Sequence, residues 1–196
     1  MPRRRAVSYD TKLEHIRDTA AGLFARDGFS RTSMAELAAA CGVSKALLYH
    51  YFDSKEALLF DILQAYLRDL ERNVAIDAAA TANARDYLRD LIGALLRQYR
   101  EAGNTHKLLT FELPVLPPEQ QAELRAAERR IMARFDHALA AAATEAGRTT
   151  PLDGPRAMML FGTLNWTYTW FREDGRLSLD AYCELVTDST VASLLA

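Results

Sequence analysis

The chain has 196 residues, of which 49% are hydrophobic and 26% charged, and its formal net charge is −2. That length is enough for a hydrophobic core in one or two domains, and the composition is ordinary for a globular protein. No apolar run reaches the ~20 residues that a membrane-spanning helix needs, and no apolar segment of a signal peptide follows the arginines near Met1, so we expect a cytoplasmic protein.

The first half of the chain predicts helices. Residues 1–9 are expected to form a loose basic arm, and apolar residues recur with a 3.6-residue period from 10 to 27, before Gly28. Ser33 and Glu36 have the spacing of a capping box, so a second helix starts at Thr32 or Ser33. A third helix starts after Ser44. A fourth opens at residues 53–56, where the same box spacing recurs.

The rest of the chain is helical in pattern as well. Apolar stripes and their Gly, Pro and Asp boundaries predict helices over about 87–102, 105–112, 118–143, 155–172 and 179–194, with a loop at 149–155. No alternating strand pattern occurs. The sequence therefore predicts an all-α protein, with one domain over residues 1–53 and a second over residues 54–196.

Residues 32–55 read TSMAELAAACGVSKALLYHYFDSK and have the layout of a helix-turn-helix, in which two short helices flank a tight turn. The second helix of this motif enters the DNA major groove. Residues 1–55 hold nine Lys/Arg and six Asp/Glu, whereas the remainder has a net charge of −5. A basic end on an acidic body favours binding of a polyanion at that end.

The candidate DNA contacts lie at the starts of these helices and along the third helix. The Ser44 hydroxyl and nearby amides can hold a phosphate, Lys45 can reach a phosphate or base edge, and Tyr49 and His50 can donate to phosphates. One of the two leucines at positions 47 and 48 must anchor the helix. The full predicted set is Thr32, Ser33, Ser44, Lys45, Leu47, Tyr49, His50 and Lys55.

Residues 10–59 closely resemble the TetR family of transcriptional regulators. The matching residues are Ala20, Leu23, Phe24, Gly28, Phe29, Thr32, Ser33, Leu37, Ala38, Gly42, Val43, Ser44, Leu48, Tyr49, Tyr51, Phe52, Lys55, Leu58 and Leu59. The resemblance implies about nine helices in an Ω-shaped homodimer that pairs through its last two helices. It also implies a C-terminal pocket for a small ligand that weakens binding to a palindromic operator. Many members carry Gly or Pro and then Thr or Ser where this chain has Ala46 and Leu47.

The body offers candidate ligand contacts among its aromatic and long apolar residues, although the same residue types also fill cores and dimer interfaces. The predicted set is Tyr66, Leu95, Tyr99, Leu108, Phe111, Met159, Trp166 and Trp170. Residues 116–119 and 165–172 look like those of TetR regulators that sense acyl-CoA thioesters. The alternative is a hydrophobic or aromatic effector without coenzyme A.

Two other classes of function compete with a regulator. An enzyme on a helical scaffold would need catalytic motifs, and the sequence has no Gly-rich phosphate loop, HExxH or GxSxG. Cys41 and Cys183 are expected to be buried thiols, no Cys/His spacing suggests a metal site, and no cofactor is expected. A dimeric adaptor that has lost DNA binding is disfavoured by the retained Lys45, Tyr49 and His50.

Overall fold

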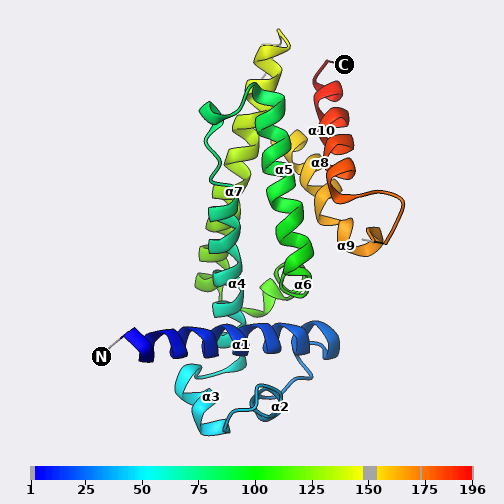
Figure 1. The fold of residues 1–196 in the computed structure, drawn as a ribbon. Helices are drawn as coiled ribbons and strands as arrows, with labels where there is room; N and C mark the ends of the chain where they lie inside the picture. The colour runs from blue at the N-terminus through cyan, green and yellow to red at the C-terminus, as the bar shows by residue number, and fades with distance from the viewer. Residues whose placement is uncertain (1–2, 148–153, 173, 196) are drawn as a thin grey trace. The chain divides into compact units, whose positions relative to one another are not determined.

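The computed structural model describes residues 3–147, 154–172 and 174–195, and within these ranges it contains helices and no strands (Figure 1). The all-α prediction is confirmed. The helices are α1 (Arg3–Asp27), α2 (Met34–Ala40), α3 (Lys45–Tyr51), α4 (Lys55–Asn73), α5 (Ala84–Glu101), α6 (Gly103–Glu112), α7 (Pro118–Glu145), α8 (Gly154–Asn165), α9 (Thr167–Trp170) and α10 (Leu179–Leu195). Short 3₁₀ turns lie at Ala78–Ala80 and Leu113–Val115. With the four-residue α9 counted as the end of α8, the described residues form the nine helices that the family resemblance implies.

The chain divides into two compact units. The first comprises Met1–Leu67 with Asn104–Leu124, and the second comprises Arg68–Gly103 with Arg125–Ala196. None of the described helices combines the length and apolar character required to cross a bilayer.

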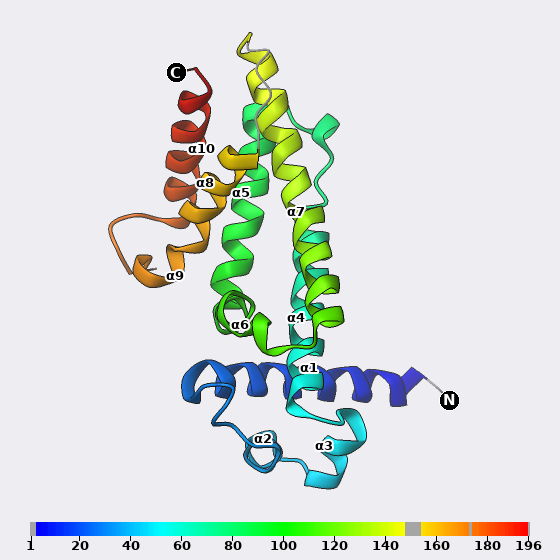
Figure 2. The same ribbon diagram turned by 180° about the vertical axis from the view of Figure 1, so that it is seen from behind.

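The first unit is built on α1, α2 and α3. The α2 helix packs against both α1 and α3, and Figure 2 shows α2 and α3 on the same side of α1. Its core includes Ile16, Phe24, Leu37 and Leu48, each at most 1% exposed. The ring of Phe24 lies 5.0 Å from that of Phe29 just beyond the end of α1. These contacts fix the short helices, which are too short to be stable alone.

The predicted caps are found at the starts of α2 and α3 but not at the start of α4. The Ser33 hydroxyl accepts the Glu36 N–H and the Glu36 carboxylate accepts the Ser33 N–H, which completes the capping box. Ser44 caps α3, whereas at the start of α4 Ser54, rather than Asp53 of the predicted box, accepts the N–H three residues later, that of Ala57. Gly28, with φ of +90°, provides the left-handed conformation that ends α1.

The helix α1 starts earlier than predicted. Residues 3–9 continue it as regular helix, so the loose arm expected there is wrong for those residues. The physical reason is that nothing after Pro2 breaks a helix, and arginine and alanine are good helix formers. Residues 1 and 2 of the expected arm lie outside the described residues.

The second unit is organised around α5, which is buried along most of its length and packs against α10. Leu91 and Leu95 of α5 are fully buried, as is Phe135 of α7, whose ring lies 4.9 Å from that of Phe161 in α8. The Tyr87 ring of α5 also lies 6.5 Å from the His137 ring of α7, so α5, α7 and α8 share one core. The loop predicted at 149–155 falls mostly outside the described residues.

The helix predicted over 155–172 is interrupted at Trp166. The Thr167 hydroxyl donates to the Leu164 carbonyl and the Thr169 hydroxyl donates to the Trp166 carbonyl, both at 2.7 Å. Hydroxyl bonds of this kind also occur at Thr187 and Thr190 inside the continuous α10, so they accompany the interruption without explaining it. The apolar periodicity of this stretch does not reveal the break.

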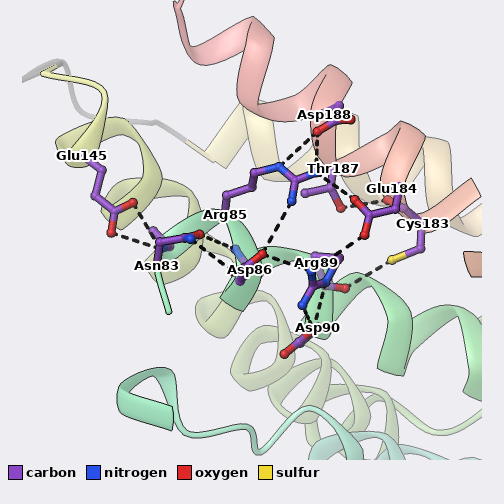
Figure 3. A network of polar contacts seen from close by, with 11 residues as sticks. Asn83, Arg85, Asp86, Arg89, Asp90, Glu145, Cys183, Glu184, Thr187 and Asp188 are labelled. Carbon is purple, nitrogen blue, oxygen red and sulfur yellow. Dashed lines mark hydrogen bonds and ion pairs between the residues drawn. The ribbon is translucent and has the colours of Figure 1, made fainter. Parts of the chain in front are cut away.

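A polar network joins the first turns of α5 to α10 (Figure 3). The Arg85 guanidinium donates to Glu184 at 2.8 Å and to Asp188 at 2.6 Å, one helical turn further along α10. These bonds raise the pKa of Arg85, with Asp188 the larger cause. The Cys183 thiol contacts the Arg89 carbonyl at 3.3 Å. The network holds α10 at the N-terminal end of α5.

Candidate nucleic-acid interface

The helix α3 is anchored through one side and exposed on the other. Leu48 is 0% exposed and Phe52, directly after the helix, is 7% exposed, so these two residues fix α3 in the first unit. The Ser44 hydroxyl accepts the Leu47 N–H at 3.1 Å, and this bond caps the first turn. Leu47 itself is half-buried. Leu48 is therefore the anchoring leucine.

The exposed side of α3 carries three of the predicted contacts. Lys45, Tyr49 and His50 are all exposed, and 43% of the Tyr49 side chain is accessible. The Lys45 ammonium lies 5.8 Å from the centroid of the Tyr49 ring, and the His50 ring lies 5.7 Å from that of Tyr51. A cation, a phenol and an imidazole thus share one accessible helix, and each of these groups can donate to a phosphate oxygen.

The start of α2 is also exposed, but its polar groups are occupied. The Ser33 hydroxyl and backbone N–H both donate to Glu36 Oε2 at 2.8 Å. These two bonds hold the pKa of Glu36 below its ordinary value, with the backbone N–H the larger cause. A carboxylate therefore occupies the place at this helix start where a phosphate would otherwise bind.

Thr32 and Lys55 have partners that the sequence did not suggest. Thr32 is buried, at 4% exposure, and its hydroxyl donates to the Gly28 carbonyl at 2.9 Å. The Lys55 ammonium donates to the carbonyls of Phe29, Ser30 and Thr32 at 2.9, 3.1 and 3.1 Å. All three protons of an ammonium group are thereby used. In this structure, these two side chains stabilise the turn between α1 and α2.

The first unit contains three of the predicted ligand contacts. Tyr66 and Leu108 are buried, and the Tyr66 hydroxyl lies 3.2 Å from Nδ1 of the buried His106. Phe111, by contrast, is 57% exposed. Sequence periodicity alone could not separate the buried residues from the exposed one.

The second unit contains the other five. Leu95 and Tyr99 are buried, whereas Met159, Trp166 and Trp170 are 72%, 61% and 47% exposed. Some of the predicted ligand contacts are therefore core residues, and the others lie on the surface.

The phenol of Tyr99 belongs to a buried polar group. It donates to Asn165 Oδ1 at 2.6 Å. Burial raises the pKa of Tyr99, and the carboxylate of Glu128 adds to this shift. Burial also raises the pKa of Glu128. This polar group joins the end of α8 to α5 inside the second unit.

A groove of about 320 Å³ lies on α8 and α10, with one residue of α7 at its edge. Its lining is mainly apolar and includes Met159, Leu160, Tyr182 and Leu185, with Arg156 and several hydroxyl groups beside them. Met158 and Leu185 on the same two helices are 58% and 54% exposed. So much apolar surface on the last two long helices is typical of a protein–protein contact.

Among the described residues, no group of three His, Cys, Asp or Glu side chains could hold a metal ion.

An anchored short helix with an exposed cationic and aromatic side, preceded by a second capped helix and a turn, defines a helix-turn-helix DNA-binding protein. The family described as "Bacterial regulatory proteins, tetR family" matches residues 16–62, and the family "Tetracyclin repressor-like, C-terminal domain" matches residues 81–194. Together they cover the helix-turn-helix and most of the body. The chain belongs to the TetR family of bacterial regulatory proteins.

Individual relatives agree with this assignment. A TetR-family regulator from Bordetella parapertussis is 33% identical, with a TM-score of 0.80 over 91% of this chain and 93% of that one. AibR, solved in complex with isovaleryl coenzyme A and operator DNA, is 30% identical, with a TM-score of 0.75 over 94% of this chain and 98% of its own. The repressor KstR2 of Rhodococcus jostii is 37% identical over 75 residues, or 38% of this chain. The chain spans 38% and 37% of the length of the first curated relatives that it matches.

Proposed function

We propose that the chain is a ligand-responsive transcriptional repressor that acts in the bacterial cytoplasm, binds a palindromic operator as a homodimer and leaves it when an effector binds. The observation that carries the proposal is the exposed side of α3, where Lys45, Tyr49 and His50 stand on a helix fixed by the fully buried Leu48. Ser44 and Leu47 complete the proposed contact surface, whereas Ser33, also predicted as a contact, is already bonded to Glu36. The repressor KstR2 and the operator complex of AibR support this reading.

The test is a titration of duplex DNA at several salt concentrations. Wild-type protein is used to select a palindromic duplex from a randomised pool, and its affinity is compared with that for a random duplex. We expect the selected duplex to bind at least 10³-fold more tightly at matched salt, as for other specific regulators. Equal affinity for both duplexes would refute the proposal.

The proposed homodimer uses α8 and α10. The groove of about 320 Å³ and the exposed Met158, Met159 and Leu185 lie on these two helices. A two-fold interface presents the same patch from both copies, so one apolar surface serves both partners. Sedimentation of wild-type protein and of a Met159→Glu variant tests this, because a charge at the centre of the interface should shift the population toward monomer.

The proposed effector is hydrophobic, and an acyl-CoA thioester is the first candidate because AibR is bound to isovaleryl coenzyme A. A coenzyme A ligand needs cations for its phosphates. Two arginines of the body are already engaged, because Arg89 pairs with Asp86 and Asp90, and Arg130 pairs with Glu71. The alternative remains an aromatic or hydrophobic effector without coenzyme A.

A thermal-shift screen separates these effectors. A ligand that binds only the folded protein raises the melting temperature. Short-chain acyl-CoA thioesters, free coenzyme A and the corresponding free acids form the test set. If only the thioester raises the melting temperature, the protein recognises both the acyl group and the coenzyme A group. If only the free acid does so, the effector without coenzyme A is favoured.

A further inference from the structure

Two exposed arginines lie at the corner between α1 and α2, and they differ in what they contact. Arg26 places its guanidinium on the Asp27 carboxylate, with bonds of 2.8 and 2.7 Å, and these bonds also lower the pKa of Asp27. Arg31 makes a single bond, from Nε to the Asp27 carbonyl at 2.6 Å. Within the described residues, its two terminal nitrogens make no hydrogen bond or ion pair. Arg26 is therefore neutralised by its neighbour, whereas Arg31 interacts with the Asp27 carboxylate only through its charge and keeps its terminal nitrogens free of hydrogen bonds among the described residues.

The backbone on both sides of Arg31 is fixed. The Lys55 ammonium binds the carbonyls of Ser30 and Thr32, which flank it, and also that of Phe29. The Thr32 hydroxyl binds the Gly28 carbonyl. The bond from Nε to the end of α1 then fixes the side chain itself. A guanidinium held at one nitrogen loses less conformational entropy when its remaining donors bind a ligand.

Arg31 is also the cation nearest in sequence to the start of α2, where Ser33 and Glu36 cap each other. The Glu36 carboxylate would repel an approaching phosphate. In a helix-turn-helix, the first helix of the motif crosses the DNA backbone. A guanidinium directly before this helix, with its terminal nitrogens not hydrogen-bonded among the described residues, can bind phosphate oxygens through two parallel N–H donors.

We propose that Arg31 is a phosphate-binding residue, presented to the DNA backbone by the turn that Lys55 holds. Lys55 then acts as a positioning residue rather than a contact. This inference rests on the proposed function, because it requires that the protein bind duplex DNA. It adds a contact that the motif pattern does not reveal, and it replaces the direct DNA contacts expected of Thr32 and Lys55.

The salt dependence of binding tests the proposal, with Arg26 as the matched control. Arg31→Gln should weaken binding to random and selected duplexes by the same factor. It should also reduce the slope of log affinity against log salt by about 0.9 per phosphate lost, or roughly 2 for a dimer. Arg31→Lys should retain most of the slope. Arg26→Gln should leave the slope unchanged, because that guanidinium is already paired with Asp27.

Two results would refute phosphate binding by Arg31. An unchanged slope in Arg31→Gln, with native thermal unfolding, would overturn it, and so would an equal loss in Arg26→Gln, because overall charge would then explain both. Wild-type protein that binds neither duplex would overturn the proposed function as well. The wild-type measurement therefore shows whether the protein binds DNA at all, separately from whether Arg31 contributes to that binding.

Discussion

The Lys45 ammonium lies 5.8 Å from the centre of the Tyr49 ring, one turn further along α3. A cation above an aromatic face is weakly attracted to it, and at an exposed site this attraction is worth about 0.5–1 kcal/mol. The contact restrains both side chains on the accessible side of the helix without using the donors of either. Both residues thus remain able to bind phosphate.

Replacing Tyr49 and His50 together by alanine should weaken binding to the selected duplex by at least about tenfold, since hydrogen bonds to charged groups are each worth roughly 1.5–3 kcal/mol. Dimerisation should not change. Fluorescence anisotropy with labelled duplex measures the first quantity and sedimentation the second. The control is His137→Ala, an exposed histidine of α7 in the second unit. Unaltered affinity in the double variant would refute the assigned contacts.

The two adjacent leucines of α3 should respond differently to truncation. Leu48→Ala should cost about 2–5 kcal/mol of unfolding free energy, because a fully buried leucine leaves a cavity. Leu47→Ala removes a half-buried side chain and should cost about 1 kcal/mol or less. Urea unfolding at one protein concentration gives both values. A similar cost at both positions would contradict the assignment of Leu48 as the anchor.

The parts of the fold that sequence predicts are those set by local chemistry. Ser33 and Ser44 lie within three residues of the N–H groups that they cap, so their spacing alone identifies two helix starts. Gly28 and the apolar periods identify the long helices in the same way. The interruption at Trp166 escapes this reasoning, because the apolar pattern continues through it.

The site is only partly predictable for a related reason. Lys55 lies 26 residues from Phe29, and nothing in the local sequence shows that its ammonium binds carbonyls of that turn. Arg31 and Arg26 look equivalent as exposed arginines until the Asp27 contacts separate them. Met159 and Tyr99 were both predicted to bind ligand, yet one is 72% exposed and the other buried. The type of a side chain does not determine its exposure or its hydrogen-bond partners. These depend on where the tertiary structure places it.

The capping box of α2 should make stability depend on pH through Glu36. Its pKa in the folded protein is lower than the ordinary value of 4.5, because the Ser33 N–H and hydroxyl bind the ionised form. A lowered folded-state pKa means that the stabilisation is fully present above pH 4.5 and is lost as the pH falls through the folded value. Glu36→Gln removes this dependence.

The comparison is made by urea unfolding of the wild type and of Glu36→Gln from pH 7 to pH 3. The wild type should be the more stable at neutral pH, and the difference should shrink below about pH 4.5. Glu119→Gln is the control, because Glu119 is also exposed in the first turn of a helix. A constant difference across the range would show that the Glu36 charge does not contribute.

The ion pairs of Arg85 with α10 should slow local opening of that helix. Arg85→Gln removes the bonds to Glu184 and Asp188, while Arg89 stays 3.8 Å from Glu184. Because these side chains are 36–63% exposed, each pair is worth about 0.2–1 kcal/mol and is weakened by salt. Amide exchange in α10 should therefore quicken several-fold at low salt and less at high salt. Arg130→Gln, which breaks the exposed pair with Glu71 between α7 and α4, should leave α10 unchanged. If α10 exchanges at the same rate in wild type and Arg85→Gln at low salt, the bonds of Arg85 do not hold α10 to α5.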